Sequence, residues 1–338
     1  MTTSTRIVLA SRPTGAPTAE NFRTETVDLP DVGDGQVSLK TLYLSLDPYM
    51  RGRMSDAESY AEPVAVGDTM VGATVSEVTE SRSDAVSVGD VVLGYTGWQS
   101  HAVVDASSVR VLDPEKAPVS TALGVLGMPG FTAYSGMTKI GQPKAGETVV
   151  VAAASGPVGS AVGQFAKIKG ARAVGIAGGP EKCAYLIDEL GFDAAVDHRA
   201  ADFKDQLKAA TPDGIDVYFD NVGGAVAKAV LPRLNLYARI PVCGLIAQYN
   251  DTQAPEGPDR LPGFFTRVLT KSLTIRGFIQ SEYVGELYKD FLREVGGWVE
   301  DGSFRYREDV VEGLENAPEA FFGLLQGKNF GKLVVKVA

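Results

Sequence analysis

Residues 149–170, VVVAAASGPVGSAVGQFAKIKG, constrain the fold of this chain more than any other stretch. They run from a continuous apolar segment, through a glycine-containing turn, into apolar residues spaced to line one face of a helix. A strand that is apolar throughout has to be buried on both faces, as it is in a parallel sheet covered by helices. The stretch therefore predicts a strand, a tight turn and a helix within a parallel α/β domain.

The same pattern recurs in the part of the chain that follows. Apolar strands are predicted at 171–178, 193–198, 215–223 and 238–245, with helices between them at 180–191, 201–210 and 225–234. A strand at 273–280, a long helix at 283–299 and a strand at 329–338 come next, and this last strand could pair with the N-terminal region. The alternation predicts a doubly wound parallel sheet.

The region before Pro118 has a different pattern of apolar and polar residues. Residues 35–46 and 87–98 alternate apolar and polar side chains between turn signals, as half-buried antiparallel strands do. The length of 338 residues exceeds the size at which one hydrophobic core stops growing, so two domains are expected. The turn-rich segment 255–263, PEGPDRLPG, is predicted to be a loop near a site entrance.

Charge and composition exclude several classes of protein. A net charge of −10 argues against nucleic-acid and anionic-membrane partners, because both would be repelled. Two cysteines and two histidines cannot supply a zinc-binding pattern or a disulfide framework, so no metal site is expected. The N-terminus has no apolar core of signal-peptide length, and no window approaches the length of a membrane span. We therefore expect a cytoplasmic protein.

The turn itself, Ala154-Ser155-Gly156-Pro157-Val158-Gly159, resembles a dinucleotide-binding turn with alanine at its first glycine. Gly156 would let the backbone approach a pyrophosphate, and Gly159 would allow close packing of helix on strand. Ala154 is acceptable there if its φ is negative. The amides at the start of the helix could then bind phosphates.

The end of the second strand, GIAGGPEK (175–182), favours NADP(H) over NAD(H). It carries no acidic residue before Glu181 to bind an adenosine ribose, whereas Lys182, His198 and Arg199 could surround a 2′-phosphate, with Gly178 and Gly179 leaving room. The alternative is that Lys182 and Arg199 are ordinary solvated charges. DNVGG (220–224) and CGL (243–245) end two further strands at the ligand-binding edge, or are plain turns.

Several blocks of the sequence together carry a family resemblance. They are LYLSLDPYMRGRM, LGVLGMPGFTAY, AAASGPVGSAVGQFAKIKG, GGPEKCAYL, FDNVGG, VCGLIAQYN and GKNFGKLVVKV. From Arg6 to Val337 the chain resembles the zinc-independent medium-chain dehydrogenase/reductases, in particular the prostaglandin and leukotriene reductases, plant alkenal double-bond reductases and bacterial NADPH-dependent curcumin reductases. In place of the G-H-E segment of zinc-dependent relatives it reads VGDTMVGATV.

The resemblance implies an α/β fold with a GroES-like, partly open β-barrel domain at 1–125 and 305–338 and a Rossmann domain at 126–304. It implies NADP(H) as cofactor, usually a homodimer, and reduction of a carbon–carbon double bond conjugated to a carbonyl in a small apolar substrate. The alternatives are an NADPH quinone reductase of the same superfamily and a non-catalytic NADPH-binding sensor.

Roles carried over from the family also stay expectations. The resemblance places Val158 with Gly156 and Gly159 at the pyrophosphate, and Lys182 at the 2′-phosphate. His198 stands where many relatives have a tyrosine. The remaining matched positions, which would line the cofactor, are Asn221, Cys243, Tyr249 and, beside the nicotinamide, Asn329.

The reaction needs a hydrogen-bond donor for the negative charge that develops on the substrate carbonyl oxygen. A tyrosine hydroxyl stays protonated at neutral pH and suits this task. We expect Tyr249 or Tyr49 to be that donor, since both lie in segments that match the family. The alternative is that each ring only packs and its hydroxyl caps a loop.

Overall fold

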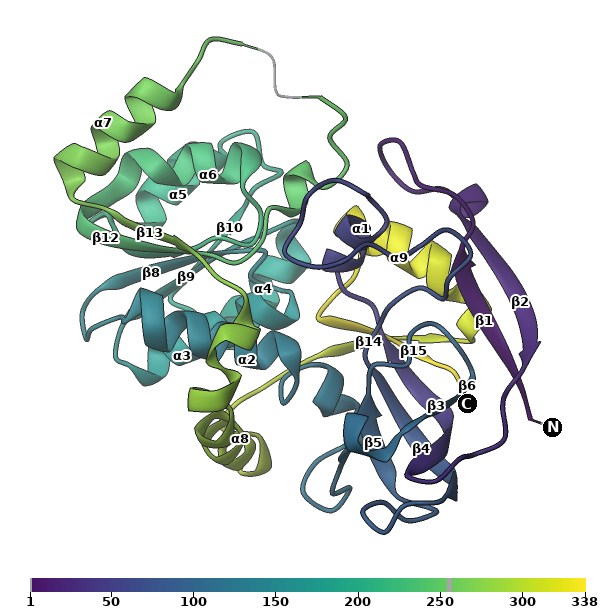
Figure 1. Cartoon of the computed structure of the whole chain (residues 1–338). Coiled ribbons are helices and arrows are strands. Elements are labelled where there is room, and N and C mark those ends of the chain that lie inside the picture. Colours follow the sequence, from purple (N-terminus) through teal and green to yellow (C-terminus); the bar gives the residue numbers. More distant parts are fainter. Residues whose placement is uncertain (1, 254–256) are drawn as a thin grey trace. The chain divides into compact units, whose positions relative to one another are not determined.

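The computed structural model describes residues 2–253 and 257–338, and the chain divides into two compact units. Unit 1 combines Met1–Gly124 with Glu308–Ala338, and unit 2 is Val125–Arg307. Figure 1 shows the chain coloured along its sequence, with strands β14 and β15, which follow unit 2 in the chain, in the yellow part of the scale.

Unit 2 is built on a six-stranded sheet whose strand order is β10-β9-β8-β11-β12-β13. Every neighbouring pair is parallel, which confirms the doubly wound sheet predicted from the sequence. The order reverses between β8 and β11, where ligands bind at the carboxyl edge of such sheets. The strands are β8 (Thr148–Ala152), β9 (Arg172–Ala177), β10 (Ala194–Asp197), β11 (Ile215–Phe219), β12 (Leu234–Val242) and β13 (Thr274–Gly277).

Helices cover both faces of this sheet (Figure 1). Along β8, Val149 and Val151 belong to the apolar core that also contains residues of α2, α3 and α8, whereas Val150 and Ala152 belong to the core shared with α5 and α6. A strand buried on both faces needs a continuous apolar sequence, which is what residues 148–152 supply. The helices of unit 2 are α2 (Met128–Gly136), α3 (Pro157–Ile168), α4 (Pro180–Asp188), α5 (Phe203–Ala210), α6 (Gly224–Val230), α7 (Leu261–Lys271) and α8 (Val284–Glu300).

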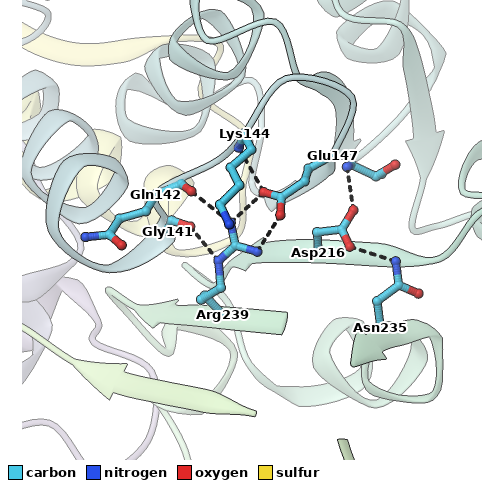
Figure 2. A network of polar contacts seen from close by, with 8 residues as sticks. Gly141, Gln142, Lys144, Glu147, Asp216, Asn235 and Arg239 are labelled. Carbon is cyan, nitrogen blue, oxygen red and sulfur yellow. Dashed lines mark hydrogen bonds and ion pairs between the residues drawn. The ribbon is translucent and has the colours of Figure 1, made fainter. Parts of the chain in front are cut away.

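A network of charged and polar groups lies at the amino edge of the sheet (Figure 2). The Arg239 guanidinium donates to both carboxylate oxygens of Glu147, at 3.0 and 2.5 Å, and to the carbonyl oxygens of Gly141 and Gln142. The Asp216 carboxylate accepts the Thr148 N–H and the Asn235 side-chain amide, each at 2.8 Å. We call this set the amino-edge network; its members are Gly141, Gln142, Lys144, Glu147, Thr148, Asp216, Asn235 and Arg239.

Unit 1 contains a seven-stranded mixed sheet in the order β14-β15-β3-β4-β5-β7, with β6 paired to β3, and a separate β1–β2 hairpin pair. β14 and β15 are parallel, and the other pairs of the sheet are antiparallel, so the final strand does pair with the N-terminal region as expected. The elements are β1 (Thr3–Leu9), β2 (Phe22–Asp28), β3 (Gln36–Ser45), α1 (Tyr49–Arg53), β4 (Thr74–Ser81), β5 (Val91–Gly94), β6 (His101–Asp105), β7 (Arg110–Val111), β14 (Glu308–Glu312), α9 (Ala317–Leu325) and β15 (Lys332–Lys336).

The predicted loop at 255–263 is only partly correct. Pro255 and Glu256 lie outside the described residues, and Leu261, Pro262 and Gly263 form the start of α7 rather than a loop. Proline is favoured in the first turn of a helix because the N–H it lacks has no intrahelical partner there. Within residues 2–253 and 257–338, none of the helices combines the length and apolar character needed to cross a membrane.

Candidate cofactor site

The turn between β8 and α3 carries its backbone strain at Ala153, one residue before the position that the motif assigns to glycine. Ala153 has φ +52°, a left-handed conformation that is unfavourable for a residue with a side chain. Ala154 is buried, is absent from the residues with positive φ, and donates its N–H to Ile176 of β9. The expectation that alanine is tolerated at position 154 is therefore confirmed.

The two glycines of the turn differ in how tightly they are packed. A Cβ on Gly159 would collide with the carbonyl oxygen of Ala153 and lie 2.6 Å from the Ala154 Cα, so only glycine fits there. A Cβ on Gly156, the residue that precedes α3, would meet only the Ala153 oxygen, at 3.3 Å. The first amides of a helix have no intrahelical acceptor and carry partial positive charge, so the turn presents donors suited to an anion.

The second strand ends in a group of basic side chains around Gly178. A Cβ on Gly178 would lie 2.9 Å from both His198 Nε2 and Arg199 Nε, so these two side chains converge over Gly178 and would have to shift if residue 178 carried a side chain. The Asp197 carboxylate holds the turns by accepting the Gly179 and Arg199 N–H groups, each at 2.9 Å. These backbone hydrogen bonds, the Gly179 N–H first, hold the pKa of Asp197 below its ordinary value.

The ends of β11 and β12 are tied together by Asp220, a residue whose role the sequence analysis missed. One oxygen of its buried carboxylate, Oδ1, accepts the Tyr218 hydroxyl and the Val222 and Gly223 N–H groups at 2.8–2.9 Å. Its carbonyl oxygen accepts the Cys243 N–H at 2.9 Å. A sequence signal exists, because an acid directly after a buried apolar strand and before two glycines needs partners in the turn.

Asn221, Cys243 and Tyr249 lie on these two connected loops. The Asn221 amide donates to the Ala152 carbonyl at 2.8 Å, which links the end of β11 to the end of β8. Cys243 is half-buried, and desolvation of its thiol, followed by the Asp220 charge, raises the thiol pKa to about 12, so it stays protonated. The Tyr249 hydroxyl oxygen accepts the Leu245 N–H at 3.4 Å.

The structure thus brings most of the candidate residues to one edge of one sheet, since each follows the carboxyl end of a strand of unit 2. We call them the carboxyl-edge residues. They are Gly156, Val158, Gly159, Gly178, Lys182, His198, Arg199, Asn221, Cys243 and Tyr249.

Tyr49 and Asn329 belong to unit 1. Tyr49 is the first residue of α1, two residues after the buried Asp47. Burial, and then the Asp47 charge, raise the pKa of the Tyr49 phenol well above its ordinary value, so the hydroxyl remains protonated. The Asn329 side-chain amide donates to the Gly331 carbonyl oxygen at 2.9 Å.

The segment between β3 and α1, which leads to Tyr49, is anchored by a buried ion pair. The Lys332 ammonium, 2% exposed, donates to the Leu46 carbonyl and to Asp47 Oδ1, both at 2.8 Å. The other Asp47 oxygen accepts a short hydrogen bond from the Ser45 hydroxyl. Because Lys332 begins β15 and Asp47 follows β3, this pair fixes the start of α1 to the sheet.

Among the described parts of the chain, no three His, Cys, Asp or Glu side chains are grouped in a way that could hold a metal ion. The carboxyl-edge residues offer glycine backbone, helix amides and basic side chains instead. This set suits an anionic ligand rather than a cation.

Two family models match the chain, one in each part of the sequence. Residues 5–112 match the family described as "N-terminal domain of oxidoreductase", and residues 157–295 match the family described as "Zinc-binding dehydrogenase". These matches define the class of protein as a dehydrogenase-type oxidoreductase.

Individual relatives narrow the class. The NADPH-dependent curcumin reductase of Escherichia coli is 56% identical over 98% of this chain and 96% of that protein. Prostaglandin reductase 1 of Rattus norvegicus is 43% identical, with 95% of each chain covered. The crystal structure of CurA from Vibrio vulnificus in complex with NADPH has a TM-score of 0.96 at 55% identity and covers 99% of both chains. The chain belongs to the medium-chain dehydrogenase/reductases, in the group that contains the curcumin, prostaglandin and 2-alkenal reductases.

Proposed function

We propose that the chain is an NADPH-dependent reductase of carbon–carbon double bonds conjugated to a carbonyl group. The observation that carries the proposal is the convergence of His198 and Arg199 over Gly178, at the end of the second strand of a dinucleotide-binding fold. An adenosine ribose lies at this place in such folds. Basic groups there select a 2′-phosphate, and the activities named for the relatives agree with this choice.

The residues of unit 2 fit NADP(H) along the whole carboxyl edge. Gly156, Val158 and Gly159 would hold the pyrophosphate through backbone amides and the positive end of α3. Lys182, His198 and Arg199 would hold the 2′-phosphate. Asn221, Cys243 and Tyr249 would line the cofactor from the connected loops after β11 and β12. From unit 1, Asn329 would bind at the nicotinamide.

When bound, NADPH supplies the hydride that adds to the β-carbon of the conjugated substrate. The protein then has to stabilise the negative charge on the carbonyl oxygen with a hydrogen bond oriented before the reaction. Tyr249 is one candidate donor, because a hydroxyl whose oxygen accepts a backbone N–H is polarised into a stronger donor. Tyr49 is the other, because its raised pKa keeps the phenol protonated at the pH of the reaction.

Replacing each tyrosine by phenylalanine tests these roles. Loss of the true donor should lower kcat/KM for an enone about 10²–10³-fold, or about 2.7–4 kcal/mol. Tyr237→Phe is the matched control, since Tyr237 is an exposed tyrosine of β12. Unchanged kcat/KM in both Tyr249→Phe and Tyr49→Phe would remove both candidates.

The function itself is tested by following NADPH absorbance with a medium-chain enone, curcumin and a quinone, with NADH in parallel. Rapid turnover of the enone or curcumin with NADPH alone is the expected result. Turnover of the quinone only would favour the quinone reductase alternative. Tight NADPH binding without turnover of any acceptor would favour a sensor protein.

We also propose that the chain forms a homodimer through β13 and α7. β13 is the edge strand of the sheet, and all its residues, Thr274–Gly277, are exposed. In α7, Leu261, Phe265 and Leu269 are 56%, 59% and 79% exposed and lie four residues apart, so they form one apolar stripe. An exposed edge strand with an apolar helix beside it is an aggregation hazard unless it is covered. A second copy related by a two-fold axis can pair with such an edge in antiparallel fashion.

The dimer is tested by sedimentation equilibrium of the full chain and of Leu269→Lys. We expect twice the mass of the chain for the wild type and a monomer for the variant. Val88→Lys, at a residue that is 64% exposed elsewhere, is the control and should stay dimeric. A monomeric wild type at micromolar concentration would refute the proposal.

We further propose that the protein acts in the cytoplasm. Both cysteines, Cys183 and Cys243, are free thiols in the structure, which suits a reducing compartment. Fractionation of the source cells with an antibody to the chain tests this, and recovery of the protein outside the cytoplasmic fraction would contradict it.

A further inference from the structure

A titratable group, the His198 imidazole, lies over Gly178. His198 Nε2 and Arg199 Nε would each lie 2.9 Å from a Cβ at residue 178, so glycine at this position leaves room for both side chains. Gly179, with φ +97°, turns the backbone away and donates its N–H to Asp197. The imidazole therefore lies beside a guanidinium at a defined point of the turn.

The charges that face His198 are of mixed sign but mostly positive. Arg199 lies next to it in the chain, Lys182 faces it from α4, and Asp197 precedes it at the end of β10. Partial burial of the ring, and then the charge of Arg199, lower the pKa of His198, and Lys182 adds to this effect while Asp197 opposes it. Above the ordinary histidine value of about 6.5, the ring is therefore neutral in the protein without ligand.

We propose that His198 determines specificity for NADPH by taking up a proton from solvent when the 2′-phosphate binds beside it. This inference rests on the proposed cofactor. A phosphate monoester carries between about 1.5 and 2 negative charges at neutral pH, so its arrival reverses the sign of the local field. The imidazolium then has N–H donors on both nitrogens, and a charge-assisted hydrogen bond to the phosphate replaces repulsion from Arg199 and Lys182.

The direction of the pH effect follows from linkage. The pKa of His198 is low without ligand and raised in the complex, so binding is strengthened at low pH and weakened as the pH rises through the bound-state value. Below about pH 6, its second pKa, the phosphate itself takes up a proton and loses negative charge, which weakens binding. The selectivity for a 2′-phosphate should thus decrease from about pH 6.5 to about pH 8.5.

Calorimetric titration of the full chain tests this without any turnover. The probes are 2′,5′-ADP, which carries the 2′-phosphate, and 5′-AMP, which lacks it. Each is titrated near pH 7 in two buffers of different ionisation enthalpy, because the difference in heat gives the number of protons taken up. The same titrations are made with His198→Phe and with His198→Tyr, the residue type of many relatives.

We expect the wild type to take up a larger fraction of a proton on binding 2′,5′-ADP than either variant does. His198→Phe should weaken 2′,5′-ADP about tenfold near pH 6.5, the effect of one charge-assisted hydrogen bond, and far less near pH 8.5. The affinity for 5′-AMP, which lacks the 2′-phosphate, should change less than that for 2′,5′-ADP and should not depend on pH in this range. Because His198 is exposed, both variants should fold, and an unchanged thermal unfolding transition checks this.

Equal proton uptake in the wild type and both variants would overturn the inference and leave the NADPH assignment standing. Failure of 2′,5′-ADP to bind more tightly than 5′-AMP at any pH would overturn both the inference and the 2′-phosphate pocket. Failure of the proposed reductase activity would appear separately, as tight 2′,5′-ADP binding in a protein that reduces no enone.

Discussion

At the amino edge of the six-stranded sheet, Arg239 is surrounded by the Glu147 carboxylate and two carbonyl oxygens, whereas at the carboxyl edge His198 and Arg199 lie together over Gly178. The first arrangement pairs opposite charges within the protein (Figure 2). The second places the His198 imidazole, which is neutral without ligand, beside the Arg199 guanidinium, where positive charges outnumber the Asp197 carboxylate. Opposite charges paired within the protein stabilise the fold, whereas a cluster with net positive charge attracts an anionic partner.

Arg239→Met should cause the largest change in stability. It leaves the Glu147 carboxylate, whose side chain is only 21% exposed, without its cation, and breaking a buried pair costs about 3–5 kcal/mol. Chemical denaturation measures the loss, which should fall at the low end of this range because the pair is not fully buried. NADPH affinity should be unchanged. A change in affinity comparable to the loss of stability would show that the two edges do not act separately.

Lys182→Met should show the reverse pattern. Removing the charge-assisted contact that we propose between Lys182 and the 2′-phosphate should weaken NADPH binding by about 1.5–3 kcal/mol, while NADH binding and stability stay the same. Fluorescence titration with both cofactors measures this. Lys204→Met, at an exposed residue of α5, is the matched control. Equal weakening of NADPH and NADH would contradict a role specific to the phosphate.

Acid should weaken the amino edge through Glu147. Burial raises the pKa of this carboxyl, but Arg239 and the Lys144 N–H more than offset the effect and hold it below the ordinary value of 4.5. Its contribution to stability is therefore complete above about pH 4.5 and is lost as the pH falls through the lower folded value. The difference in unfolding free energy between the wild type and Glu147→Gln should shrink on acidification. A constant difference would mean that the carboxylate is not paired in solution.

Lys167→Met should have the smallest effect. Lys167 and Asp193 form an ion pair at 2.7 Å near the amino edge, with side chains 39% and 27% exposed. Pairs in solvent contribute about 0.2–1 kcal/mol and are screened by salt. Thermal unfolding at low and high salt measures the change. A loss as large as that of Arg239→Met would show that position at the edge, rather than burial, decides the contribution.

The fold could be predicted because its signals are local. The apolar run 148–152 predicted a strand buried on both faces, and the long helix predicted at 283–299 is α8 (Val284–Glu300). The amino-edge network could not be predicted, because Arg239 and Glu147 are 92 residues apart and neither lies in a motif.

For the site, the sequence identified which residues follow the carboxyl ends of strands but not how they are held. It correctly accepted alanine at position 154 but did not indicate that Ala153, one residue earlier, takes the left-handed conformation. It passed over Asp220 and Asp197, whose carboxylates act through backbone N–H groups of neighbouring turns. Which side chains accept these hydrogen bonds depends on how two loops pack against each other. The apolar–polar pattern of the sequence carries no information about that packing.

The position of β15 between β14 and β3 has a consequence for biosynthesis. Unit 1 needs this strand to complete its sheet and needs Lys332 to neutralise Asp47, yet both are translated after the whole of unit 2. Domains generally fold as units while synthesis proceeds. Unit 2 can therefore fold during synthesis before β15, the strand that pairs with β3 of unit 1, has been made.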